Sequence, residues 1–109
     1  VRLRGGGDGV THRGRVEVHH DGTWGTVCDD EWGKPDADVV CRQLGFPRGS
    51  LKATNRSAFG SGGLEFMLDD VACTGEEVSL ADCRHNGWGE HNCRENEAAG
   101  VICATDDGG

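Results

Sequence analysis

The stretch PDADVVCRQLG, residues 35–45, decides the fold that this sequence predicts. Proline stands at a first helical position, acidic residues fill the first turn and glycine follows the end, an order typical of an α-helix. The apolar residues recur at i, i+3, i+4 and i+7 and so define one buried face: Ala37, Val40, Cys41 and Leu44. We therefore expect one main helix with a cysteine on its buried side.

The residues before this helix predict β-structure. Apolar and polar residues alternate over residues 1–4 and 15–19, as in half-buried strands. Asp21-Gly22 is typical of a hairpin turn and leads into a third strand over residues 23–27. The N-terminal third of the chain is thus expected to be β-structure.

The residues after the helix carry weaker signals. Residues 45–65 are rich in Gly, Ser and Arg and predict loop around one short strand at residues 58–59. Strands are also expected at 66–68 and 101–103. Thr74 and Glu77 have the spacing of a capping box ahead of a short second helix through Val78, Leu80 and Ala81.

Length and composition indicate one small domain that needs covalent support. Of 109 residues, 35% are hydrophobic, 19 are Gly and none is Tyr, so apolar burial alone leaves such a chain only marginally stable. Its 6 cysteines, with no C-x-x-C pair, are typical of a secreted disulfide framework. We expect one domain over residues 1–104 and an acidic, glycine-rich tail over 105–109.

The charge balance restricts the partners. With 11 basic and 19 acidic residues the net charge is −8, which disfavours nucleic acid and anionic lipid and favours a cation or a basic partner. No apolar run approaches the ~20 residues that cross a bilayer. We expect an extracellular domain, secreted or part of a membrane protein's ectodomain, without direct membrane insertion and monomeric in isolation. Asn55 opens the sequon Asn-Arg-Ser, either a glycosylation site or a chance triplet.

Catalytic patterns are weak. The histidines, His12, His19, His20, His85 and His91, suggest zinc only if cysteines remain as thiolates, which disulfides exclude. Ser61 lacks the Gly-x-Ser-x-Gly spacing of a nucleophile elbow, and residues 5–9 (GGGDG) lack that of a phosphate loop. Paired carboxylates can serve glycoside hydrolysis, but Trp24 and Trp32 are more simply explained as core residues flanking Cys28. We therefore predict that the domain is not an enzyme.

Seven segments together resemble the scavenger receptor cysteine-rich domain, in its six-cysteine group A form. They are residues 14–18 (GRVEV), 24–30 (WGTVCDD), 39–45 (VVCRQLG), 68–75 (LDDVACTG), 79–83 (SLADC), 91–93 (HNC) and 99–103 (AGVIC). The resemblance implies an α+β fold in which a curved antiparallel sheet cradles one main helix. It also implies the disulfides Cys28–Cys93, Cys41–Cys103 and Cys73–Cys83, which the spacing alone does not select.

The resemblance further implies two acidic cation sites. Carried over by position, the first has Asp29, Asp30 and Glu97, and the second has Asp69, Asp70 and Asn92. The family's usual C-x-H-x-E-D-A-G-V reads CRENEAAGV over residues 93–101, so an acid is lost at Ala98 and one gained at Glu95. Oxygen ligands favour calcium, with magnesium as the stricter alternative. An isolated Asp-Asp pair is typical of a solvated loop, but two doublets beside one disulfide favour a cation site.

Four further residues are weaker candidates for ligand binding: Arg15, Glu17, Trp88 and Glu95. Arg15 and Glu17 lie in a stretch similar to one that binds bacteria in some family members. Trp88 either packs under a loop or presents an aromatic anchor. The overall prediction is a calcium-dependent domain of the scavenger or innate-immune type that recognises extracellular protein or polyanionic, microbial ligands. The alternative is a non-catalytic accessory or regulatory module of a secreted mosaic protease or lysyl-oxidase-like enzyme.

Overall fold

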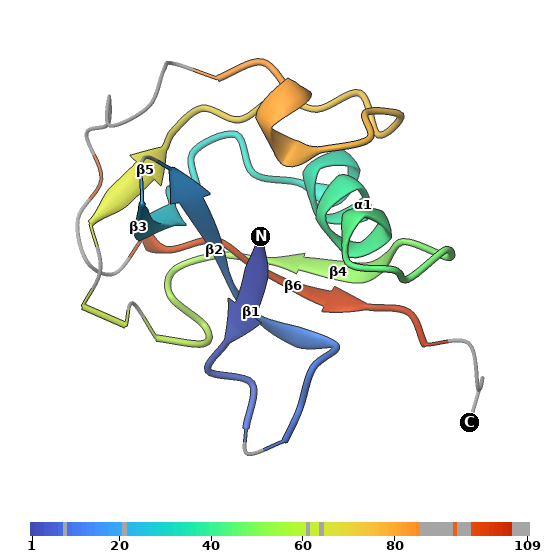
Figure 1. Cartoon of the computed structure of the whole chain (residues 1–109), viewed down its shortest axis with the longest axis horizontal. Helices are drawn as coiled ribbons and strands as arrows, with labels where there is room; N and C mark the ends of the chain where they lie inside the picture. Colours follow the sequence, from blue (N-terminus) through green and yellow to red (C-terminus); the bar gives the residue numbers. More distant parts are fainter. Residues whose placement is uncertain are drawn as a thin grey trace.

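A curled sheet and one helix form the framework of the domain (Figure 1). The computed structural model describes residues 1–7, 9–20, 22–60, 62–63, 65–85, 93 and 97–105. Within these residues the elements are β1 (Arg2–Arg4), β2 (Arg13–His20), β3 (Thr23–Val27), α1 (Lys34–Gln43), β4 (Ser50–Thr54), β5 (Phe66–Leu68), η1 (Leu80–Asp82) and β6 (Gly100–Cys103). The strand order is β4-β6-β2-β3-β5, and β1 pairs with β2. The predicted α+β architecture is confirmed.

The sheet is mixed rather than wholly antiparallel. Strands β1, β3 and β6 all run antiparallel to β2, and β4 runs antiparallel to β6. Strand β5 is parallel to β3. The predicted hairpin is confirmed, since His20 pairs with Thr23 across a two-residue turn in which Gly22 has a φ of 81°.

Helix α1 forms where the sequence predicts it. Its buried face includes Ala37, Val40 and Cys41. Asp36 in the first turn is also buried, because its carboxylate accepts hydrogen bonds from the backbone N–H groups of Gly33, at 2.8 Å, and Cys73, at 2.7 Å. The carboxylate therefore caps the helix and ties it to the loop that carries Cys73.

The strand predicted at residues 58–59 is wrong, and β4 lies earlier. Ala58 and Phe59 belong to a turn that follows Arg56 and Ser57, whose φ angles of 51° and 53° are incompatible with a strand. Strand β4 alternates polar and apolar residues, but its burial reverses the usual pattern: Ser50 and Thr54 are buried, and Leu51 is 68% exposed. Its register against β6 also shifts between Ser50 and Lys52, so the strand does not present one regular apolar face to the core.

The short second helix is displaced from its predicted start. Within the described residues 74–85 the single turn η1 forms, and Ser79 caps it by accepting a hydrogen bond from the N–H of Ala81 at 3.3 Å. Glu77 does bond Thr74, accepting from its backbone N–H at 2.9 Å, but this contact closes a loop and starts no helix. Val78 is 83% exposed, so the predicted helical face is absent there.

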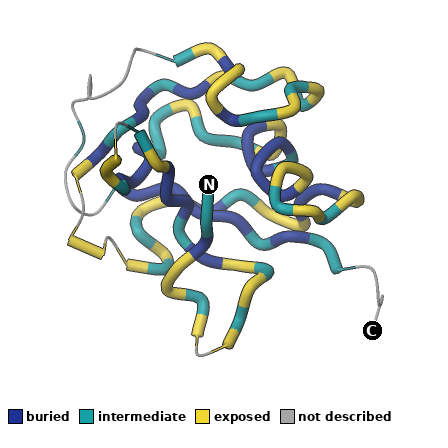
Figure 2. The backbone as a smooth tube through the Cα atoms, in the orientation of Figure 1, coloured by how far each residue is buried: buried dark blue, intermediate teal, exposed yellow. Residues whose placement is uncertain are grey.

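All three predicted disulfides are present, and they connect the core. Cys28–Cys93, Cys41–Cys103 and Cys73–Cys83 join the chain at separations of 65, 62 and 10 residues. Buried segments of the sheet and of α1 face one another (Figure 2). The Cys41–Cys103 bridge fastens α1 to β6 within this core.

Trp24 and Trp32, both predicted to be core residues, lie in different environments. Trp32 packs against the core, and its indole N–H donates to the carbonyl of Gly100 at 3.0 Å. Trp24 is only half-buried and lies on the sheet surface, where the guanidinium of Arg2 stacks 3.9 Å from its ring centroid. A core role for Trp24 is therefore wrong.

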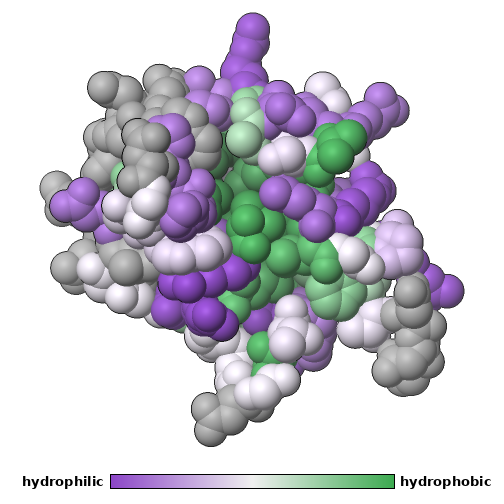
Figure 3. Space-filling model, viewed as in Figure 1, coloured by the Kyte–Doolittle hydropathy of each residue, from purple (hydrophilic) through white to green (hydrophobic). Residues whose placement is uncertain are grey.

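One face of the domain has an apolar centre with a hydrophilic border. Figure 3 shows hydrophobic side chains in the middle of the face viewed in Figure 1, bordered by hydrophilic ones. None of the helices in the described residues is long and apolar enough to span a membrane.

Candidate metal centre

The parallel pairing of β3 and β5 brings the two aspartate doublets together. Asp29 and Asp30 come one residue after the end of β3, and Asp69 and Asp70 directly follow β5. Because parallel strands end at the same edge of a sheet, both doublets leave the sheet side by side. The backbone N–H of Cys28 donates to the carbonyl of Leu68 at 2.9 Å and extends this pairing up to the doublets.

A glycine permits the close approach of these strands. A Cβ atom on Gly25 in β3 would lie 2.8 Å from the carbonyl oxygen of Glu65 and would collide with the side chain of Met67. Any larger residue would therefore separate β5 from β3. The family-like segment WGTVCDD thus contains both the glycine that admits β5 and the carboxylates placed by it.

Glu97 enters from a third segment. The N–H of Asp29 donates to the carbonyl of Glu97 at 2.8 Å, and Cys28 forms an isolated β-bridge with Ala98. The Cys28–Cys93 disulfide fixes the same neighbourhood covalently, with 5.9 Å between the two Cα atoms. Two hydrogen-bonded segments and one disulfide therefore hold the acidic side chains in place.

Asp30 lies at the centre of the carboxylates. It can place an oxygen within 4.8 Å of oxygens from Asp69 and Asp70, which themselves lie within that distance of each other. An Asp30 oxygen also lies within 4.8 Å of a Glu97 oxygen and of the Cys93 sulfur. The sulfur is disulfide-bonded and offers no thiolate. The two cation sites that the sequence predicts separately thus share Asp30. We call the four carboxylates gathered there the acidic cluster: Asp30, Asp69, Asp70 and Glu97.

Asp29 stands at the border of the acidic cluster. Its Oδ2 atom accepts a hydrogen bond from the backbone N–H of Arg56 at 2.7 Å. Among the groups of possible metal ligands found in the described residues, none contains Asp29. The sequence could not indicate this role, since nothing in the spacing places residue 56 beside residue 29. Asn92 lies outside the described residues, as do Trp88 and Glu95.

The electrostatics of the cluster fit a cation. Partial burial raises the pKa of the Asp30 carboxyl above its ordinary value, and the negative charges of Asp69, Glu97, Asp29 and Asp70 raise it further. Asp69 is 2% exposed, and its Oδ1 accepts the N–H of Asp70 at 2.8 Å. A cation would relieve the repulsion, and three or four carboxylates are a ligand set suited to calcium.

The backbone is strained beside both doublets. Glu31 and Asp70 have φ angles of 66° and 53°, in the left-handed region that favours glycine. Residues in this conformation persist only where their surroundings impose it. Here the two left-handed residues lie in the turns that follow β3 and β5.

Glu17 has a different environment from the one predicted. It is 1% exposed, and its carboxylate bonds the guanidinium nitrogens of Arg2 and Arg15, each at 2.7 Å. Arg15 also donates to the carbonyl of Phe59 at 3.0 Å. Glu17 therefore holds β1 and β2 together from within, and only its arginine partners reach the surface.

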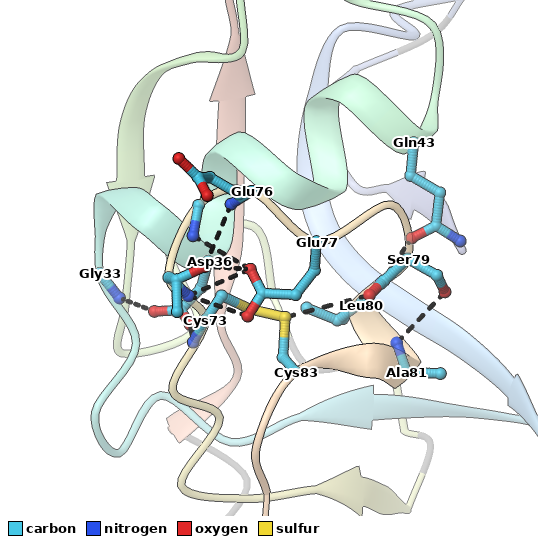
Figure 4. The surroundings of a disulfide bond; sticks show 12 residues. Gly33, Asp36, Gln43, Cys73, Glu76, Glu77, Ser79, Leu80, Ala81 and Cys83 are labelled. Carbon is cyan, nitrogen blue, oxygen red and sulfur yellow. Dashed lines mark hydrogen bonds between the residues drawn. A yellow bond between two sulfur atoms is a disulfide. The ribbon is translucent and has the colours of Figure 1, made fainter.

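A second group of possible ligands is structural. Cys73, Glu77 and Cys83 lie close together, but Cys73 and Cys83 are joined as a disulfide (Figure 4). Hydrogen bonds, first from the backbone N–H of Thr74, lower the pKa of Glu77 to about 2. The carboxylate thus closes the loop next to α1. No group of possible ligands among the described residues includes a histidine.

A sheet stapled by three disulfides around one helix, with no free cysteine, defines the class of small, disulfide-rich extracellular domains. The family model of the scavenger receptor cysteine-rich domain matches residues 6–104. The chain belongs to that family, and its six cysteines and three disulfides are those of group A. Domains of this family are non-catalytic and extracellular.

Relatives support this assignment over nearly the whole chain. Galectin-3-binding protein of Pongo abelii is 51% identical over 106 residues, which are 97% of this chain and 18% of that protein. The chain thus spans less than a fifth of that relative. The scavenger receptor cysteine-rich domain of mouse MARCO, solved in a dimeric form, is 49% identical with a TM-score of 0.78, covering 95% of this chain and 94% of that one. The third such domain of murine neurotrypsin is 46% identical with a TM-score of 0.80, covering 94% and 92%.

Proposed function

We propose that this domain is a calcium-dependent recognition module that binds its ligands through the acidic cluster. The observation that carries the proposal is the convergence of Asp30, Asp69 and Asp70 within 4.8 Å of one another. These side chains come from two turns that the parallel strands β3 and β5 place together. Carboxylates gathered from distant segments create a local negative potential that a divalent ion neutralises.

Calcium fits this ligand set better than the alternatives. Calcium accepts roughly six to eight oxygen ligands in flexible geometry. Water completes its coordination where the protein supplies too few ligands. Magnesium demands a stricter octahedron, and zinc favours the nitrogen and sulfur ligands that the cluster lacks. In the proposed site Asp30, Asp69 and Asp70 hold the ion, with Glu97 at its side. When bound, the ion supplies positive charge to an otherwise acidic face.

That charge sets the ligand chemistry. With the ion bound, the face engages carboxylate- or sulfate-bearing polyanions by completing the coordination of calcium, and basic protein surfaces by the remaining carboxylates. Extracellular proteins and polyanionic microbial or modified-lipoprotein surfaces present such groups. The similarity to domains of MARCO and galectin-3-binding protein is consistent with a recognition module.

Calorimetric titration of the purified domain with calcium tests the metal site. We expect heat of binding and a rise in melting temperature at millimolar calcium or below. Asp30→Asn keeps the side-chain shape and should abolish both effects. Glu31→Gln is the matched control, because Glu31 is an exposed neighbour outside the cluster. Absence of heat and of thermal stabilisation in the wild-type domain would refute the metal site.

Dextran sulfate provides a defined polyanion for the second test. We expect the domain to bind it in calcium and to lose binding in a chelator, and Asp30→Asn to fail in both conditions. Equal binding with and without calcium would assign the polyanion to another surface, such as the exposed arginines of β1 and β2.

The similarity to one numbered domain of neurotrypsin favours a second candidate, an accessory module of a larger secreted protein. In that role the domain spaces or regulates its neighbours and has little affinity of its own. Retained calcium binding with no binding to polyanions or basic proteins would support this candidate over the first.

A further inference from the structure

The sequon Asn55-Arg56-Ser57 forms an exposed corner at the end of the edge strand β4. Asn55 is the first residue after the strand, and its carbonyl accepts the N–H of Ala58 at 3.1 Å in a tight turn. The Asn55 side-chain amide forms no hydrogen bond with the described part of the chain. Its nitrogen is therefore presented to solvent on an ordered turn.

The same turn forms the border of the acidic cluster. The N–H of Arg56 donates to Oδ2 of Asp29 at 2.7 Å. With ordinary backbone bond lengths this places the Cα atom of Asn55 within about 5.6 Å of that carboxylate oxygen.

Ser57 fastens the turn to the segment that carries Glu97. Its N–H donates to the carbonyl of Ala98, and its Oγ accepts the N–H of Ala98, each at 3.0 Å. Glu97 directly precedes Ala98. The sequon thus contacts both Asp29 and the chain next to Glu97.

We propose that Asn55 carries an N-linked glycan and that this glycan restricts which partners reach the acidic cluster. In the transfer step the Asn55 amide nitrogen attacks the anomeric carbon of an oligosaccharide held on a polyprenyl diphosphate. The new C–N bond replaces the C–O bond to the diphosphate, the amide proton passes to a base of the transferase, and the lipid diphosphate departs. Since folding engages the Ser57 hydroxyl with Ala98, the transfer precedes closure of this turn in the secretory pathway.

The size of the glycan determines what it excludes. A hydrated calcium ion passes beside it, whereas a folded protein approaching over Asp29 meets a bulky, mobile sugar chain. Protein partners are therefore directed to the Asp69 and Asp70 side of the cluster. This consequence rests on the proposed function, but glycosylation of Asn55 does not.

Secretion from a eukaryotic host provides the test. Wild type should gain the mass of an N-glycan, Asn55→Gln should not, and Leu51→Gln is the matched control, because Leu51 is exposed on β4 and the substitution leaves the sequon intact. Calcium affinity should agree within about twofold among the three proteins. Lysozyme, a small basic protein, should bind Asn55→Gln at least about tenfold more tightly than it binds wild type at low ionic strength.

The results test two parts of the inference separately: the glycosylation of Asn55, and the restriction of protein partners by the glycan. Unmodified Asn55 in secreted wild type overturns the glycosylation, and equal lysozyme affinities of wild type and Asn55→Gln overturn the restriction. Absence of calcium binding in all three proteins refutes the metal site but leaves the mass and lysozyme comparisons decisive for this inference. If Asn55→Gln is not secreted, trimming the folded wild type to one sugar with an endoglycosidase gives the same comparison.

Discussion

Asp30→Asn should raise the stability of the domain without calcium and lower it, relative to wild type, with calcium. The reason lies in the convergence of Asp30 with Asp69 and Asp70, which are distant in sequence. Their mutual repulsion arises only on folding, so it destabilises the folded state of the ion-free domain. Asparagine keeps the size of the side chain and removes the charge.

The magnitude follows from the distances. Unit charges at 4.8 Å repel by about 0.9 kcal/mol in water. Removing three such pairs, with Asp69, Asp70 and Glu97, raises the free energy of unfolding by about 1 kcal/mol once salt screening and partial exposure have reduced each repulsion. For 109 residues this corresponds to about 4 °C in melting temperature. Calcium at a hundredfold excess over its dissociation constant stabilises wild type by about 2.7 kcal/mol, which reverses the order of the two proteins.

Differential scanning calorimetry in chelator and in calcium measures both effects, with Glu31→Gln as the control for net charge.

The pH dependence gives an independent check. Because the pKa of Asp30 is raised in the folded state, its protonation stabilises the fold below the ordinary pKa, and this contribution is lost as pH rises through the raised value. The advantage of Asp30→Asn in chelator should therefore vanish at acid pH. A variant less stable than wild type in chelator at neutral pH would refute the reasoning.

Three further substitutions test the framework by thermal unfolding. Glu17→Gln should lower the free energy of unfolding by about 3 kcal/mol, because Arg2 and Arg15 lose their buried carboxylate partner. If the free energy of unfolding falls no more than in an exposed Glu→Gln control, this prediction is wrong. Trp32→Phe should cost about 1–3 kcal/mol, since the β6 carbonyl loses its indole donor and the core loses volume. Asp36→Asn should lower the free energy of unfolding by about 1–3 kcal/mol at neutral pH, because the N–H of either Gly33 or Cys73 then faces the amide NH₂ group of asparagine. An unchanged melting temperature would show that this helix cap is dispensable.

The sequence predicts best where local chemistry decides the structure. The periodicity of α1, its proline and its glycine act within eleven residues, and the Asp21-Gly22 turn determines the hairpin through its own backbone preference. Strand β4 was missed because it buries the polar residues Ser50 and Thr54 and exposes Leu51, the reverse of the burial on which strand prediction depends. The segment 74–81 was misassigned because Glu77 bonds Thr74 in a loop as readily as at a helix start.

The candidate site could be predicted in its residues but not in its arrangement. The resemblance supplied the two doublets and the disulfides, yet it divided the carboxylates into separate sites. The parallel pairing of β3 with β5 brings Asp69 to Asp30, and the β-bridge between Cys28 and Ala98 brings Glu97 to the same residue. Parallel pairing leaves no local sequence signature, because it joins segments forty residues apart. The contact of Arg56 with Asp29 is equally non-local.

The three disulfides explain how the domain can hold a cluster of like charges before any ion binds. In the chain-entropy model Cys28–Cys93 and Cys41–Cys103 each contribute about 4 kcal/mol, and Cys73–Cys83 about 3 kcal/mol. Repulsion of about 1 kcal/mol at Asp30 is small beside these contributions. We therefore expect the fold to be independent of calcium, and the proposed site to be assembled before an ion binds. A preformed site avoids the cost of ordering three separate segments on binding, so affinity depends on the cluster itself rather than on folding.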